Sequence, residues 1–258
     1  MSTFAFLSFH GIMLGDLMSW DYFLILAFLL FIVPWRSNSR VRALLEAPPL
    51  SSSERIGLYF STMAIQWLIA AIILWRIRVH HVAFASLGIA LPSPGRALTA
   101  AAVLTVLLVL NQVFGLRRLA TLSAERRGII PRLAEKLLPR NRPETFVAVL
   151  LVISVAICEE VIYRGFVQAI FQGLLSSSAL AGAGISALFF SFAHLYQGRK
   201  GLLTTFVVGL IFSATRIWTG SLFPCIFIHF CVDFSAGVVV SRLAGLQTSP
   251  SLTERGIS

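Results

Sequence analysis

The chain has 258 residues, of which 57% are hydrophobic and only 12% are charged. Soluble domains carry about 25% charged residues, so the composition excludes a soluble globular protein and indicates a polytopic membrane protein. The net charge of +10 comes mostly from arginine, because lysine occurs only at positions 136 and 200. In a membrane protein such an excess anchors cytoplasmic loops, and nothing in the sequence points to nucleic-acid binding.

Apolar stretches follow one another along the chain, and most approach the roughly 20 residues that a helix needs to cross a membrane, although the first is short. Seven are predicted, at residues 20–35, 56–75, 97–114, 144–175, 179–195, 202–218 and 222–243. An eighth, re-entrant segment within residues 1–17 stays open, because His10 and Asp16 interrupt it. The sequence therefore predicts an all-α transmembrane bundle that forms one integral membrane domain over residues 1–258.

Polar segments between these stretches set the expected orientation. Residues 36–55 are predicted to form a polar loop, and part of the long basic segment 117–142 an amphipathic helix on the lipid headgroups. With the N-terminus outside, sixteen basic residues fall in cytoplasmic loops and four in outer loops. We therefore expect an extracytoplasmic N-terminus and a cytoplasmic C-terminus. The arginine-rich composition favours a bacterial inner membrane protein.

Two carboxylates and a guanidinium interrupt the fourth apolar stretch at Glu159, Glu160 and Arg164. Each charge within a hydrophobic span costs about 2.5–3.5 kcal/mol, so such residues usually face a wet or protein-lined cavity with a function. On a helix, Glu160 and Arg164 are an i,i+4 pair, which leaves Glu159 without a partner in its own helix. We expect Glu160 and Arg164 to support the site and Glu159 to do chemistry. In the alternative interpretation, all three only snorkel or pair between helices.

Two further stretches carry titratable groups, His194 on the fifth and His229 with Asp233 on the seventh. A lone histidine near a span end often only meets water, and His229 with Asp233 could simply bond to neighbouring helices. Titratable groups on three separate helices favour a shared site instead. Glu159 with an imidazole could activate water, and a second imidazole could stabilise an oxyanion. Alternatively, Glu159, His194, His229 and Asp233 could bind a divalent metal such as zinc.

The order of these motifs resembles one family. Glu159-Glu160-x-x-x-Arg164, Phe190-x-x-x-His194 and His229-x-x-x-Asp233 on successive apolar stretches look like the CAAX prenyl protease 2 family, also called CPBP. That family includes bacteriocin-processing enzymes and a bacterial lysostaphin-resistance-like branch. The resemblance covers roughly residues 145–240, which we expect to be the catalytic core, whereas the first three stretches match only in being apolar.

The resemblance implies an intramembrane endopeptidase with an active-site cavity inside the bundle. Glu159 and His194 would activate water, His229 and Asp233 would stabilise the oxyanion, and Glu160 and Arg164 would support the site. Some members have Asn in place of Asp233, and an ionised Asp cannot donate a hydrogen bond as Asn does. Asp233 would then be protonated, orient His229, or bind metal.

The predicted function is cleavage of a membrane-associated or membrane-anchored protein or peptide by water that Glu159 and His194 activate. We favour a reaction without a cofactor, and a divalent metal such as zinc is the alternative. A different class of function would use the same buried residues for ion or proton transport, or in a pseudo-protease scaffold. The identity of the substrate, including whether it is prenylated, does not follow from the sequence.

Overall fold

The computed structural model describes residues 19–122, 129–175 and 178–248, and every element in these ranges is helical. This confirms the predicted all-α class. The elements are α2 (Trp20–Ala27), η1 (Phe28–Ile32), α3 (Val33–Glu46), α4 (Ser52–Val79), η2 (Phe84–Leu87), α5 (Pro94–Ala120), α6 (Ile130–Leu137), α7 (Arg142–Glu159), η4 (Glu160–Val167), α8 (Gln168–Leu174), α9 (Ala179–Ala193), η5 (Leu195–Gln197), α10 (Gly198–Thr219) and α11 (Phe223–Thr248).

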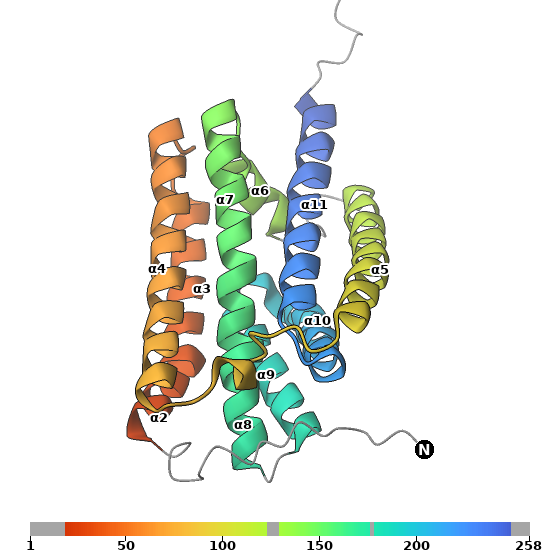
Figure 1. Cartoon of the computed structure of the whole chain (residues 1–258). Coiled ribbons are helices and arrows are strands. Elements are labelled where there is room, and N and C mark those ends of the chain that lie inside the picture. Colours follow the sequence, from red (N-terminus) through yellow and green to blue (C-terminus); the bar gives the residue numbers. More distant parts are fainter. Residues whose placement is uncertain (1–18, 123–128, 176–177, 249–258) are drawn as a thin grey trace, which may run out of the picture.

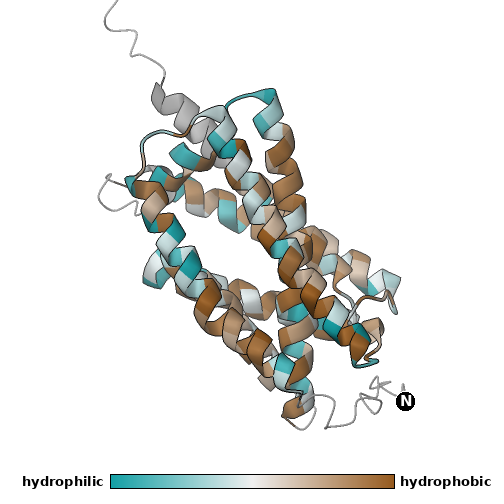
Figure 2. Ribbon diagram, turned by 90° about the vertical axis from the view of Figure 1, so that its left-hand side faces the viewer, coloured by the Kyte–Doolittle hydropathy of each residue, from teal (hydrophilic) through white to brown (hydrophobic). Residues whose placement is uncertain are grey.

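Lipid is the natural environment of this bundle. Among the described residues, five helical segments are long and apolar enough to cross a membrane, and two shorter apolar helices complete the seven predicted stretches. Their most apolar windows are only 11–39% buried in the bundle, so most of their hydrophobic surface faces outward. Figure 2 shows hydrophobic residues, in brown, along most of the helices. The chain is therefore an integral membrane protein, and the open eighth segment lies outside the described residues.

The predicted polar loop at residues 36–55 is mostly helical, which corrects that expectation. The first helix continues through its arginines to Glu46, and α4 begins at Ser52. Arginine is a good helix former, so its polarity does not end a helix, whereas Pro48 and Pro49 do. Ser51 then starts α4 with a capping box shared with Glu54.

The long helices run in alternate directions along the chain, and α7 lies between α4 and α11 (Figure 1). Helix α7 continues through η4 into α8 as one apolar helix from Arg142 to Leu174. Helix α4 packs on α7, α9 packs on η4 and α10, and α11 packs on both α7 and α5. Helices from all parts of the described chain therefore surround the segment that carries Glu159 and Glu160.

Small residues allow the close helix contacts on one side of this centre. A Cβ atom at Gly182 of α9 would lie 2.7 Å from the backbone oxygen of Gln168, and one at Gly209 of α10 would lie 3.1 Å from Ala187. Membrane helices commonly associate through such small residues, because backbones can then approach. The result fixes α8, α9 and α10 tightly beside η4.

Candidate active site

The charged motif lies on a π-helical turn rather than on a regular α-helix. Glu159 ends α7, and η4 runs from Glu160 to Val167 with every side chain buried. A π turn carries about one extra residue and occurs frequently at functional sites. The hydrophobic pattern predicted one uninterrupted helix here, because the apolar spacing of so short a turn differs little from that of an α-helix.

Glu160 and Arg164 form an ion pair at the centre of the bundle. Arg164 Nη1 donates to Glu160 Oε1 at 3.1 Å, and both side chains are fully buried. The guanidinium carbon lies 4.2 Å from the ring centroid of Phe190 and 5.2 Å from that of Phe212, so two aromatic faces contact its charge. The i,i+4 spacing therefore still joins the pair although the turn is π-helical.

The same Glu160 carboxylate holds His229 of α11. His229 Nδ1 lies 2.8 Å from Glu160 Oε1, so Nδ1 carries the proton of this hydrogen bond if the carboxylate is ionised. The other ring nitrogen, Nε2, lies 3.5 Å from Asp233 Oδ2 and 3.9 Å from Glu159 Oε2. One imidazole thus links the carboxylates of α7, η4 and α11.

The Glu159 carboxylate accepts a hydrogen bond from a helix that carries none of the three motifs. Gln66 of α4 donates from Nε2 to Glu159 Oε1 at 3.0 Å. The second oxygen, Glu159 Oε2, and the Gln66 amide oxygen are both buried and have no hydrogen-bond partner among the described residues. Sequence reasoning missed Gln66, although a lone amide in an apolar span is the kind of signal that could have marked it.

His194 lies at the end of α9, where the helix gives way to η5. Its Nδ1 lies 2.8 Å from the Phe190 backbone oxygen, which can only accept, so Nδ1 carries a proton. In the neutral ring, Nε2 then has a free lone pair. No hydrogen bond joins this ring to the Glu159 carboxylate in the described structure.

Comparison with known families identifies the region that holds these motifs. Residues 141–235 match the model of the type II CAAX prenyl endopeptidase, Rce1-like family. The match covers less than half of the 258-residue chain. No curated protein and no solved structure matches the chain.

The matched region begins just before α7 and ends two residues after Asp233, so it contains all three motifs. The match confirms the resemblance inferred from those motifs and supports an intramembrane protease of the CAAX type. Gln66 lies outside the matched residues, so α4 adds a side chain to the site from beyond the matched region.

The metal-binding alternative requires Glu159, His194, His229 and Asp233 to converge on one point. Within the described residues, no three His, Cys, Asp or Glu side chains are placed so that they could hold a metal ion. In this arrangement, the described residues of the site therefore do not fit a metal ion.

The expected cavity around the site stays a prediction. A pocket of about 200 Å³ lies next to the site, lined by apolar residues of α7 and α11 such as Ile157 and Phe230. Glu159 and His229 do not line it, and their side chains are 14% and 7% exposed. This pocket therefore borders the helices that carry the site without containing its polar groups.

Proposed function

We propose that this protein is a CAAX-type intramembrane endopeptidase in which Glu159 activates the hydrolytic water. The observation that carries the proposal is the asymmetry of the Glu159 carboxylate. Oε1 receives the Gln66 amide at 3.0 Å, whereas Oε2 is buried without a hydrogen-bond partner in the described structure. A buried carboxylate with one oxygen held and the other without a hydrogen bond has the form expected of a general base.

His194 is proposed to share the activation of water with Glu159. Its Nδ1 is held by the Phe190 backbone oxygen, which orients the ring and leaves Nε2 as the acceptor nitrogen. A water between Glu159 Oε2 and His194 Nε2 could donate to both groups. The base would take the proton as oxygen attacks the scissile carbonyl, and the protonated group would later donate to the leaving amine.

His229 and Asp233 are proposed to stabilise the oxyanion that this attack creates. With Nδ1 bonded to Glu160, the Nε2 atom of His229 is the nitrogen on the side of Glu159 and Asp233. In its doubly protonated form, the ring would donate from Nε2 to the oxyanion. Asp233 would orient this ring or, as a neutral acid, donate alongside it.

Glu160 and Arg164 are proposed to hold His229 in place rather than to contact substrate. Arg164 fixes the Glu160 carboxylate at 3.1 Å, and that carboxylate fixes the imidazole at 2.8 Å. Because the chain of contacts is buried and short, small rotations of His229 would be costly. This arrangement preorganises the donor before the oxyanion forms.

The proposed substrate is a protein or peptide anchored in or associated with the membrane, since the site residues lie on helices that face lipid. The proposed orientation has the N-terminus outside and the C-terminus in the cytoplasm of a bacterial cell. Transport or a non-catalytic scaffold would use the same buried residues, and the test below separates them from proteolysis.

The test compares membrane proteomes of cells that express the parent protein, Glu159→Gln or Glu46→Gln. Glu46 is the last residue of α3 and is exposed, so it supplies the same chemical change away from the site. We expect a shortened membrane protein with the parent and with Glu46→Gln, and its uncut form with Glu159→Gln. Identical proteomes in all three would support transport or scaffolding instead.

A further inference from the structure

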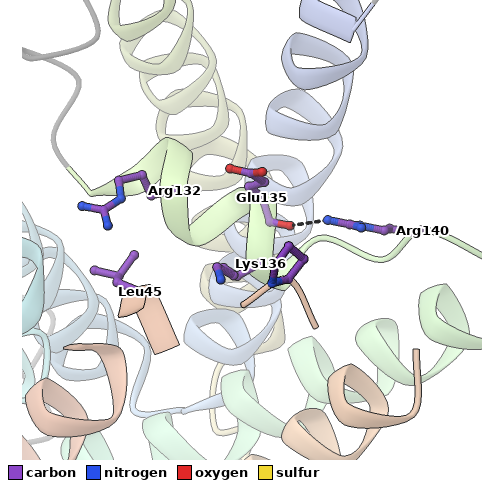
Figure 3. Close-up of a pocket in the computed structure, with 6 residues that line it drawn as sticks. Leu45, Arg132, Glu135, Lys136 and Arg140 are labelled. Carbon is purple, nitrogen blue, oxygen red and sulfur yellow. Dashed lines mark hydrogen bonds between the residues drawn. The ribbon is translucent and has the colours of Figure 1, made fainter. Parts of the chain in front are cut away.

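A basic pocket lies at the end of the bundle where α6 meets the connection between α3 and α4 (Figure 3). Its volume is about 250 Å³, and it is separate from the site described above. The side chains that line it are Leu45, Pro49, Arg132, Glu135, Lys136 and Arg140. Three cationic residues and one carboxylate make the pocket attractive to an anion.

Several hydrogen-bond donors of this pocket remain available. Arg132 has no hydrogen bond or ion pair with any described residue, and Arg140 uses one Nη2 bond on the Glu135 backbone oxygen, at 3.1 Å. Lys136 Nζ contacts the backbone oxygens of Ala47 and Pro48, which leaves one of its three protons. A phosphate oxygen could therefore be bound without breaking these contacts.

The pocket walls are fixed by a buried arginine. Arg55 of α4 donates from Nε to the Lys136 backbone oxygen at 3.0 Å and from Nη2 to the Leu50 oxygen at 3.1 Å. Its Nη1 forms an ion pair with Glu144 of α7 at 2.9 Å, and both side chains are 1% exposed. Helix α6 is thus bonded to the connection after α3 and to the start of α4, so the pocket is preorganised.

The pocket lies where the ends of three candidate membrane spans meet. The candidate span Trp20–Glu46 ends beside the pocket, and the candidate spans that begin at Ser52 and Arg142 start there, so we expect the pocket at the level of the headgroups. The lining also combines apolar Leu45 and Pro49 with the cations. A lipid would place its phosphate on the cations and its glycerol backbone against the apolar wall.

The Glu135 carboxylate limits which kinds of lipid headgroup could bind in the pocket. In Figure 3, its carboxylate is turned to the side away from the Lys136 ammonium, so it does not neutralise that cation. An ionised carboxylate can only accept hydrogen bonds, and it repels a bare phosphate. A headgroup that carries hydroxyl groups beyond its phosphate could satisfy the cations and Glu135 together.

We propose that this pocket binds the phosphodiester of an anionic lipid with a hydroxyl-bearing headgroup, as in phosphatidylglycerol. The proposal does not depend on proteolysis. The phosphate could also come from a soluble phosphate, so the test must separate the two sources.

The test is native mass spectrometry of the purified full chain with short-chain phosphatidylglycerol, phosphatidylcholine or inorganic phosphate. We expect retention of phosphatidylglycerol over phosphatidylcholine. Arg132→Gln should weaken its binding about tenfold, since it removes a charged donor without a structural partner. Arg42→Gln is the matched control, because Arg42 is an exposed cation of α3 that does not line the pocket.

Three outcomes would overturn the proposal. Equal retention of phosphatidylcholine would show that headgroup charge and hydroxyls are not recognised. Inorganic phosphate that displaces phosphatidylglycerol at similar concentration would indicate a soluble anion site. An equal loss with Arg42→Gln would show that general surface charge, rather than the pocket, holds the lipid.

Discussion

Gln66 on α4 and Glu159 on α7 are 93 residues apart in the chain, yet Gln66 Nε2 lies 3.0 Å from Glu159 Oε1. This bond comes from outside residues 141–235, the part of the chain with the family match. It leaves Glu159 Oε2 as the oxygen without a hydrogen-bond partner in the described structure, 3.9 Å from His229 Nε2. The first half of the chain therefore contributes a hydrogen bond to the proposed catalytic base, Glu159, as well as helices to the bundle.

Gln66→Met should lower kcat about tenfold or more with little change in KM. A hydrogen bond to a charged group contributes about 1.5–3 kcal/mol, and methionine keeps the volume of glutamine without its donor. The measurement is steady-state cleavage kinetics of a verified substrate. Gln112→Met is the matched control, because Gln112 donates to the Val232 backbone oxygen at 3.3 Å instead. An equal loss in both variants would assign Gln66 to helix packing alone.

Arg164→Ala should lower membrane yield and thermal stability. It leaves the fully buried Glu160 without its cation, and breaking one side of a buried ion pair costs about 3–5 kcal/mol in soluble proteins. The double variant Glu160→Gln, Arg164→Gln should recover part of this loss, as measured by thermal unfolding in detergent. If Arg164→Ala is inactive but as stable as the parent, Arg164 contacts substrate or the reacting atoms.

Asp233→Asn should lower activity about tenfold, equivalent to roughly 1.4 kcal/mol of barrier. The amide keeps the shape of Asp233, which lies 3.5 Å from His229 Nε2 and is 40% exposed, so the fold should tolerate the change. Parent and variant are assayed after extensive chelation and again with zinc added. Parent activity that chelation abolishes and stoichiometric zinc restores, with none in the variant, would instead assign Asp233 to a metal site.

Arg55→Met should destabilise the bundle through Glu144, because both side chains are 1% exposed and the carboxylate would lose its cation. We expect a loss of about 3–5 kcal/mol, measured by thermal unfolding. Arg78→Met serves as control, since Arg78 is an exposed arginine later on the same helix. Equal stability of the two variants would show that the contacts of Arg55 make no net contribution to the free energy of unfolding.

The sequence predicted the helices well because composition and length decide them in a membrane. The proximity of His229 to Glu159 and Asp233 was also predictable, since charged residues in apolar helices are stabilised by common partners. Of the two contacts that Glu160 makes, only one was predicted. Its pair with Arg164 follows from i,i+4 spacing, whereas its contact with His229 joins residues 69 apart and depends on helix packing.

Three features were not predicted from the sequence. The π turn at Glu160–Val167 differs from an α-helix by about one residue, which the apolar pattern does not resolve. Gln66 is a single amide whose partner lies on another helix. Arg55 and Glu144 are charged residues near span ends, where the sequence alone indicates water rather than a buried pair.

The central claim is that Glu159 activates water in an intramembrane protease. Its most direct test is cleavage of a substrate, identified by the proteomic comparison, by purified protein reconstituted in vesicles. We expect cleavage by the parent and by Glu46→Gln, and none by Glu159→Gln at unchanged thermal stability. Cleavage by purified Glu159→Gln at a rate near that of the parent would contradict the account.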